Sequence, residues 1–355
     1  MELLKDWFRR SFSDPQVVIL GLVLIVAFAI IIGLGKWLAP MFASIVIAYL
    51  LDALVNRLKK WGMPRLPAVI IVFLLFMTVM IFLTFGLVPI VIKQLTALVQ
   101  QFPNYVARGQ ELLKQLPEAY PQLISEEQIQ IIITQLGQEV AVLGQAALTW
   151  SLASVASVIG LVIYLVLVPV LVFFLLKDKD LLIDWVSNYL PEERTLVNSV
   201  WTESEAQVAN YVRGKVTEIV IVGSVTYVTF IILDLDYSAL LATLVGFSVL
   251  VPYIGAAVVT IPIALIAFFQ FGWGWDFGQV IIAYAIIQAL DGNLLVPLLF
   301  SEVVNLHPVA IILAILVFGG LWGFWGIFFA IPLATLVKAV LNAWPRQQDE
   351  VEEAA

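Results

Sequence analysis

Residues 67–92 read PAVIIVFLLFMTVMIFLTFGLVPIVI, a stretch of 26 residues without a single charged side chain. A helix needs about 20 mostly apolar residues to cross the hydrocarbon core of a bilayer. This stretch is flanked by Arg65 on one side and Lys93 on the other. It is therefore predicted to be a transmembrane helix, and it sets the interpretation of the rest of the chain.

The composition of the whole chain supports a membrane protein. Of the 355 residues, 62% are apolar and 12% are charged, and the mean hydropathy is +1.02. Soluble domains carry about 25% charged residues, so a soluble enzyme is excluded. The chain has no Cys, one His and a net charge of −8, which excludes Cys-ligated metal sites and gives no basis for nucleic-acid binding.

Further apolar stretches predict an all-α, polytopic integral membrane protein with about eight transmembrane segments. The expected segments are 17–35, 41–55, 67–92, 152–176, 216–233, 239–271, 279–300 and 309–337. The domain organisation that follows has six parts. They are a three-span region (1–92), an extracytoplasmic amphipathic helical insertion (93–150), a fourth span (151–176), a cytoplasmic helical loop (177–215), a transport core (216–340) and a disordered tail (341–355).

Two segments in the C-terminal third are too long and too interrupted for straight helices. Pro252 and Pro262 interrupt 239–271, and a glycine-rich run interrupts 309–337. Each segment either crosses the membrane once as a bent helix or forms two half-helices that enter and leave the membrane on one side. Broken helices at membrane depth are tolerated only where they face protein or water, and they often mark a transport site. A proline kink and a glycine packing seam are the structural alternative. The predicted flexible breaks are Pro252, Gly255, Gly319, Gly320, Gly323 and Gly326.

The basic residues predict the orientation. With the N-terminus in the cytoplasm, all of the 18 Lys and Arg residues except Lys36, Lys93, Arg108 and Lys114 lie inside. The positive-inside rule therefore places both termini in the cytoplasm. In the outside insertion, Pro103, Pro117 and Pro121 are expected to cut an amphipathic helix into pieces. That insertion is expected to pack on the membrane surface or against sister subunits.

Polar residues in apolar surroundings are the candidates for a substrate or ion pathway, because they are costly in lipid unless paired or hydrated. Glu218 has a local alternative, an i,i+3 pair with Lys215. Asp291 could instead cap a helix end, and His307 could be an interfacial hydrogen-bonding residue. The predicted pathway residues are Arg213, Glu218, Gln288, Asp291, Asn293, Glu302 and His307.

Common nucleotide-binding and catalytic motifs are absent from the sequence, which has no P-loop, no HExxH and no GxSxG. No enzyme activity, catalytic residue, metal or cofactor is expected. Without a nucleotide site, transport must be passive or ion-coupled.

Several motifs resemble one family over nearly the whole chain, in order and in spacing. They are Phe174-Leu-Leu-Lys-Asp178, Tyr211-Val-Arg-Gly214, Val251-Pro-Tyr-Ile-Gly255, Asp291-Gly-Asn-Leu-Leu-Val-Pro297, Leu306-His-Pro308, Gly319-Gly-Leu-Trp-Gly323-Phe-Trp-Gly326 and Ala330-Ile-Pro-Leu-Ala334. Together they resemble the signature of the autoinducer-2 exporter family, the PerM-like permeases. The chain departs from the family at Lys215, where Gln is usual, and at Asp234-Leu-Asp236, where Gly is common.

The resemblance implies a permease or secondary transporter of the bacterial inner membrane that exports a small polar solute or a signalling molecule. It also implies a homo-oligomer, with a pentamer as the expected state. A sodium(lithium)/proton antiporter is the alternative within the family. The alternative of another class is a non-transporting scaffold or a channel-like assembly. The expected partners are membrane lipid and a small polar solute, cation or proton, with no nucleic acid.

Overall fold

The computed structural model describes residues 15–119, 127, 129–131, 133–134, 163–189, 195–252, 254–300 and 306–343. Within these residues every regular element is a helix and no strand is present. The predicted all-α fold class is therefore confirmed.

The N-terminal half consists of long helices. They are α2 (Pro15–Lys60), α3 (Arg65–Phe82), the π-helical turn η1 (Leu83–Leu87), α4 (Val88–Ala119), the unlabelled helix Ile163–Lys177, α6 (Lys179–Ser187) and α7 (Thr195–Ile232). The C-terminal third is built from shorter pieces. They are α8 (Ser238–Ser248), α9 (Ile254–Phe271), α10 (Trp275–Leu290), the π-helical turn η2 (Asp291–Leu295), α11 (Val296–Phe300), α12 (Pro308–Trp322), α13 (Phe324–Phe328) and α14 (Ala330–Ala343).

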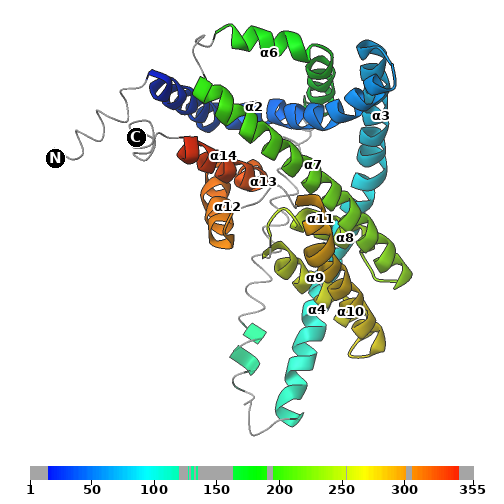
Figure 1. The fold of residues 1–355 in the computed structure, drawn as a ribbon. Helices are drawn as coiled ribbons and strands as arrows, with labels where there is room; N and C mark the ends of the chain where they lie inside the picture. Colours follow the sequence, from blue (N-terminus) through cyan, green and yellow to red (C-terminus); the bar gives the residue numbers. More distant parts are fainter. Residues whose placement is uncertain are drawn as a thin grey trace, which may run out of the picture.

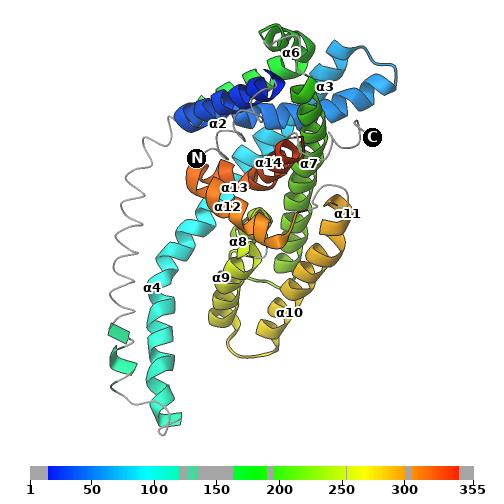
Figure 2. The same cartoon turned by 60° about the vertical axis from the view of Figure 1, so that its left-hand side comes forward.

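The helices form an elongated assembly in which α7 packs against α2, α8, α10, α11 and α14 (Figure 1). Both views place α6 at one end and the turn between α9 and α10 toward the other (Figure 2). Helix α4 runs beside α8 and α9 and extends past the α9–α10 turn. This arrangement places the middle of α7 next to the ends of α8, α10 and α12.

Five helices of the described chain are long and apolar enough to cross a membrane. They cover Trp37–Lys60, Arg65–Gln115, Val200–Ile232, Ile254–Phe271 and Trp275–Phe300. Many of their large apolar side chains are exposed, for example Leu74 and Phe82 on α3 and Ile261 on α9. Exposed apolar area on this scale is typical of a surface that contacts lipid. The prediction of a polytopic membrane protein is confirmed, and the number of crossings stays a prediction.

The first two expected spans form one uninterrupted helix in the structure. Helix α2 continues through Lys36 and Pro40, where the sequence predicted a reversal between 17–35 and 41–55. A proline inside a helix costs about 3 kcal/mol. Opening a turn in apolar surroundings would leave several backbone groups without partners, which costs more. The helix therefore tolerates the proline, and the Ser44 hydroxyl donates to the Pro40 carbonyl at 2.6 Å.

The expected cuts at Pro103 and Pro117 are also wrong, because α4 runs through both prolines. Both side chains lie on a helix with many exposed positions, so carbonyls freed by the prolines can be solvated. Pro121 and most of the remaining insertion lie outside the described residues. The domain boundaries drawn at 92/93 and 215/216 fall within α4 and α7, respectively.

The two interrupted segments of the C-terminal third are broken in the structure. The first divides after Ser248 into α8 and α9, which pack against each other, whereas Pro262 lies inside α9. The second divides into α12, α13 and α14, with α12 packed against both of the others. The break after α12 occurs at Gly323, whose φ of 60° favours glycine.

Buried apolar clusters hold these pieces together. One lies among α7, α8, α9 and α10 and includes the fully buried Phe230, Leu241 and Ile263. A second joins α2, α3 and the helix Ile163–Lys177. A third packs α7 against α11, α13 and α14 around Tyr211 and Phe300. The first and third clusters meet along α7, where the candidate site lies.

Candidate functional site

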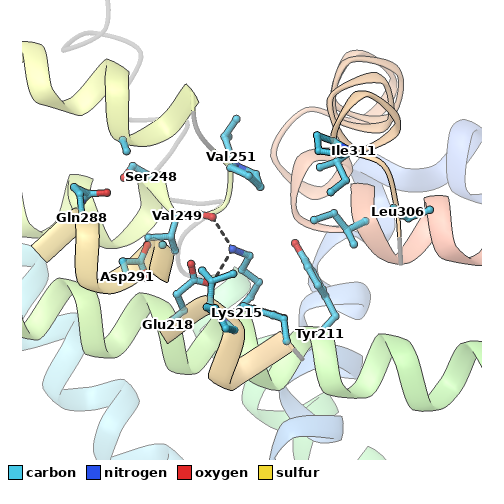
Figure 3. Close-up of a pocket in the computed structure, with 18 residues that line it drawn as sticks. Tyr211, Lys215, Glu218, Ser248, Val249, Val251, Gln288, Asp291, Leu306 and Ile311 are labelled. Atoms are coloured by element: carbon cyan, nitrogen blue, oxygen red, sulfur yellow. Dashed lines mark hydrogen bonds and ion pairs between the residues drawn. The ribbon is translucent and has the colours of Figure 1, made fainter. Parts of the chain in front are cut away.

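A cavity of about 620 Å³ lies where α7, the α8–α9 break, α10 with η2 and α11, and the start of α12 meet (Figure 3). Two expected pathway carboxylates, Glu218 and Asp291, line it together with Gln288 and the helix break at Pro252. The complete lining is Tyr211, Lys215, Glu218, Ser248, Val249, Val251, Pro252, Ala256, Gln288, Asp291, Gly292, Val296, Pro297, Phe300, Leu306, Pro308, Ile311 and Ile331.

Helix α7 contributes three polar side chains to this cavity. Tyr211, Lys215 and Glu218 follow each other at spacings of four and three residues, so they lie on one face of the helix. All three are nearly fully buried, with Lys215 4% and Glu218 1% exposed. A single helical face therefore presents a phenol, an ammonium and a carboxylate to the same space.

Lys215 has a complete set of neighbours. Its ammonium donates to the Glu218 carboxylate at 2.8 Å and to the Val249 carbonyl at 2.8 Å. It also lies over the Phe300 ring, 5.1 Å from the centroid. Val249 is the residue that ends α8, so the cation sits at the negative end of the α8 dipole. The i,i+3 pair between Lys215 and Glu218 that the sequence offered as an alternative is confirmed.

Helix α10 supplies the other polar wall. Gln288 and Asp291 are three residues apart and share a face of the helix. The helix does not end at Asp291. It continues through η2, where the Val296 N–H donates to the Asp291 carbonyl five residues earlier. Asp291 therefore does not cap a helix end, and it begins a π-helical turn, a feature that is frequent at functional sites.

Three buried polar atoms of the cavity lining have no hydrogen-bond partner among the residues that the structure describes. They are the Tyr211 hydroxyl, the Gln288 amide nitrogen and one carboxylate oxygen of Asp291, Oδ1. An unpartnered buried polar group costs about 1–3 kcal/mol, and more when it is charged. Both hydrogen-bond donors and an acceptor are therefore free to contact a molecule in the cavity.

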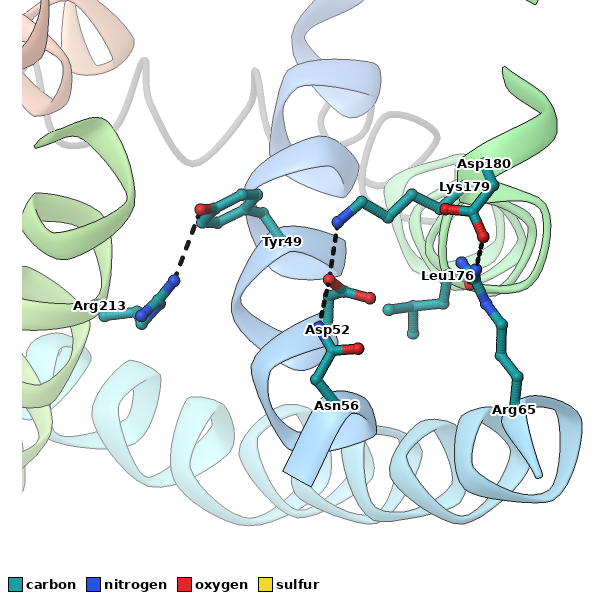
Figure 4. Close-up of polar contacts among 8 residues, drawn as sticks. All are labelled: Tyr49, Asp52, Asn56, Arg65, Leu176, Lys179, Asp180 and Arg213. Carbon is teal, nitrogen blue, oxygen red and sulfur yellow. Dashed lines mark hydrogen bonds and ion pairs between the residues drawn. The ribbon is translucent and has the colours of Figure 1, made fainter. Parts of the chain in front are cut away.

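The other expected pathway residues lie elsewhere. The Arg213 guanidinium reaches Tyr49 of α2, at 3.5 Å from its hydroxyl and 5.6 Å from its ring centroid (Figure 4). The Asn293 amide donates to the Ala289 carbonyl of its own helix at 2.8 Å. The His307 ring nitrogen Nδ1 accepts from the Val309 N–H and caps α12. Glu302 lies outside the described residues.

The glycines named as flexible breaks have different surroundings. A Cβ added to Gly255 would lie 1.8 Å from the Ser248 carbonyl oxygen, and one added to Gly326 would lie 1.8 Å from that of Phe318. At Gly319 an added Cβ would meet the Ile327 side chain at 2.9 Å, whereas Gly320 has open space. Gly255 and Gly326 therefore allow backbones to touch directly at the two breaks.

A second polar group lies near α6, away from the cavity. The Lys179 ammonium contacts the Asp52 carboxylate at 2.8 Å, and the Arg65 guanidinium is paired with Asp180 and donates to the Leu176 carbonyl (Figure 4). We refer to these two ion pairs as the α6 clasp. They join α2 and α3 to the start of α6.

Sequence reasoning missed three parts of the site. The sequence marked Tyr211 only as part of a motif, and Lys215 only as a partner of Glu218 and as a departure from the family. The spacing of Tyr211, Lys215 and Glu218 along one face of a helix was the available signal. Phe300 packs on α7 because Gly214 has no side chain, since a Cβ there would lie 2.6 Å from the Phe300 ring. That contact has no signal in the sequence.

Metal binding has no support in the part of the chain that the structure describes, where no three His, Cys, Asp or Glu side chains gather. The site instead offers one buried ion pair, one further carboxylate and two free hydrogen-bonding groups within a mostly apolar wall. Small-molecule sites usually combine an apolar lining with a few placed polar groups.

Comparison with known proteins shows sequence similarity to transport proteins over nearly the whole chain. The chain is 47% identical over 348 residues to PerM of Escherichia coli (strain K12), named as a candidate permease, covering 98% of this chain and 99% of that protein. It is 27% identical over 291 residues to YueF of Bacillus subtilis (strain 168), named as a candidate transport protein, covering 79% and 78%. Residues 18–346 match the family described as "AI-2E family transporter". The chain therefore belongs to the AI-2E family of membrane transporters.

Proposed function

We propose that this protein is a secondary transporter of the bacterial inner membrane that exports a small polar solute or signalling molecule through the cavity beside α7. Both termini lie in the cytoplasm in this proposal, and the protein works as a homo-oligomer, a pentamer by family resemblance, surrounded by lipid. No cofactor takes part.

The observation that carries the proposal is the set of unpartnered polar atoms beside the break between α8 and α9. The Tyr211 hydroxyl, the Gln288 amide nitrogen and Asp291 Oδ1 face a cavity whose wall includes the end of α8 and the start of α12. Irregular backbone at membrane depth is tolerated where it lines a cavity, and broken helices often mark a transport site. A scaffold protein would have no need for such groups.

Sodium(lithium)/proton antiport is the second candidate function. Two carboxylates, Glu218 and Asp291, line the same cavity, and carboxylate relays are common in ion-coupled transporters. A channel-like assembly would use the same cavity, but it would stay open to both sides at once. The proposal and these alternatives differ in how the cavity is exposed to solvent.

Thiol accessibility tests the proposal directly, because the chain has no native cysteine. Ser248→Cys places one thiol in the cavity wall. The probe is a membrane-impermeant methanethiosulfonate applied to right-side-out and to inside-out vesicles. Gly274→Cys, in the exposed α9–α10 turn, is the control for sidedness, and Ala68→Cys, which is fully buried, is the unreactive control.

A transporter that alternates between two states should expose the Ser248→Cys thiol from each side, while Gly274→Cys reacts from one side only. Labelling from neither side, or from a single side, would contradict transport through this cavity. A pre-reacted thiol should also stop flux in a transporter. A channel would instead let the probe applied to one side reach the opposite compartment.

A further inference from the structure

The cavity beside α7 has two chemically different sides. Figure 3 shows Gln288, Asp291 and Glu218 on one side and Leu306 and Ile311 on the other. Ile331 of α14 extends the apolar side. A molecule that fills this space must therefore present a polar end to α10 and an apolar surface to the start of α12.

The charges of the polar side do not balance. Lys215 and Glu218 form an ion pair at 2.8 Å and neutralise each other. Asp291 adds a second carboxylate, and no ion pair to it occurs among the residues that the structure describes. Its Oδ1 is buried and receives no hydrogen bond. An ionised carboxylate in such a place is costly, so a bound cation that donates to it would recover that cost.

The polar side suits an ammonium group because of Asp291, whereas the Tyr211 hydroxyl lies on the other side of Lys215, toward Leu306 (Figure 3). The Tyr211 oxygen is buried, unpartnered and able to accept a hydrogen bond, as Asp291 Oδ1 is. An ammonium group has several N–H donors and no acceptor, so it can donate to Asp291 Oδ1. The Tyr211 and Phe300 rings, 5.8 Å apart, add aromatic surface of the kind that attracts organic cations.

The apolar side argues against a bare inorganic ion. A desolvated metal cation such as Ca²⁺ needs about six or more oxygen ligands. The described chain gathers no three acidic or His side chains, and Val251, Leu306 and Ile311 are hydrocarbon. The volume of about 620 Å³ lies in the range of pockets for small organic molecules, about 300–1,000 Å³.

We propose that the cavity binds a small organic ammonium ion, with its cationic head at Asp291 and its apolar body against Leu306, Ile311 and Ile331. This inference rests on the proposed function, because it names the class of solute that the cavity holds. The free Gln288 amide nitrogen would donate to an oxygen of a ligand that carries one.

Ligand-induced stabilisation of the purified full-length protein in detergent tests the inference. The probes are n-butylammonium, n-butanol, n-butyrate and ammonium, each at the same concentration and ionic strength, and unfolding is followed by the fluorescence of the 11 tryptophans. We expect a concentration-dependent rise in Tm with n-butylammonium alone. An equal rise with n-butanol, n-butyrate or ammonium would overturn the proposal.

Variants separate the head from the body of the ligand. Asp291→Asn should abolish the n-butylammonium shift, whereas Asp276→Asn, the same change at an exposed position of α10, should preserve it. Ile311→Ser should weaken n-butylammonium binding several-fold while the protein still folds. An unchanged shift in Asp291→Asn would overturn the assignment of the head group.

Protection of the single thiol of Ser248→Cys gives a readout that keeps Asp291 intact. With n-butylammonium at ten times its Kd, labelling should slow by about tenfold, because only the empty cavity reacts. If the thiol is reached from both sides but n-butylammonium gives no protection, the ammonium inference fails and the proposed transport function stands. If the thiol is unreactive from both sides, the proposed function fails first.

Discussion

Lys215 and Glu218 form an ion pair one helical turn apart on α7, with 2.8 Å between Nζ and Oε2 and both side chains buried. Removing one partner of a buried pair leaves an uncompensated charge, which costs about 3–5 kcal/mol. Lys215→Met and Glu218→Leu should each lower the free energy of unfolding by about this amount. The double variant should regain most of the loss, because it buries no charge.

Thermal or denaturant unfolding in detergent, arranged as a double-mutant cycle, measures this coupling. Lys177→Met is the matched control, because Lys177 and Asp178 form an exposed pair at 3.3 Å. Its effect should stay below about 1 kcal/mol. Additive losses in the double variant would show that the two buried charges do not depend on each other.

Gly255→Ala should strongly destabilise the α8–α9 pair. The added Cβ would lie 1.8 Å from the Ser248 carbonyl oxygen, a backbone atom that cannot move without shifting α8. Overpacking of this kind costs about 1–3 kcal/mol or more. Gly278→Ala on α10 has open space and should keep or raise Tm. Equal Tm values for the two variants would refute the backbone contact.

Gln94 of α4 caps the start of α8, since its Oε1 accepts from the Leu240 N–H at 2.8 Å. Gln94→Leu would leave that N–H without a partner and should cost about 1–3 kcal/mol. Gln94→Glu keeps the acceptor and places a negative charge at a helix N-terminus, so its stability should match or exceed that of wild type. Unfolding curves of the two variants give the comparison, and a stable Gln94→Leu would contradict it.

The α6 clasp should contribute little to the free energy of unfolding, and its contribution should depend on the salt concentration. Its ion pairs, Asp52 with Lys179 and Arg65 with Asp180, include half-buried and exposed side chains. Lys179→Ala should lower stability by about 1 kcal/mol or less at low ionic strength. The difference should shrink at 1 M salt, where the Debye length is about 3 Å. A loss that salt leaves unchanged would indicate a packing role for Lys179.

Sequence patterns correctly predicted those features that depend only on residues close together in the chain. Uncharged length identified 67–92, and Pro252 marked a true break because the chain there also has to turn from α8 into α9. Pro40 and Pro262 gave the same signal and were misleading, since the helices continue through them. What distinguishes these prolines is the packing of the flanking helices, which a single sequence does not contain.

The candidate site was predictable only where its members share a helix. Spacing along one helical face groups Gln288 with Asp291. It also groups Tyr211 with Lys215 and Glu218. The meeting of these two groups depends on how α10 crosses α7. Arg213 is separated from Lys215 because residues two apart point to different sides of a helix, and Arg213 faces Tyr49 of α2.

The π-helical turn at Asp291–Leu295 gives α10 a property that an ordinary α-helix lacks. The turn holds one residue more than an α-helical turn, and one residue corresponds to about 100° of rotation and 1.5 Å of advance along the axis. Because of the extra residue, α11 and its Phe300 ring face a direction about 100° away from where an unbroken α-helix would place them relative to Asp291. This offset brings the Phe300 ring over Lys215 of α7, with 5.1 Å between the ammonium and the ring centroid.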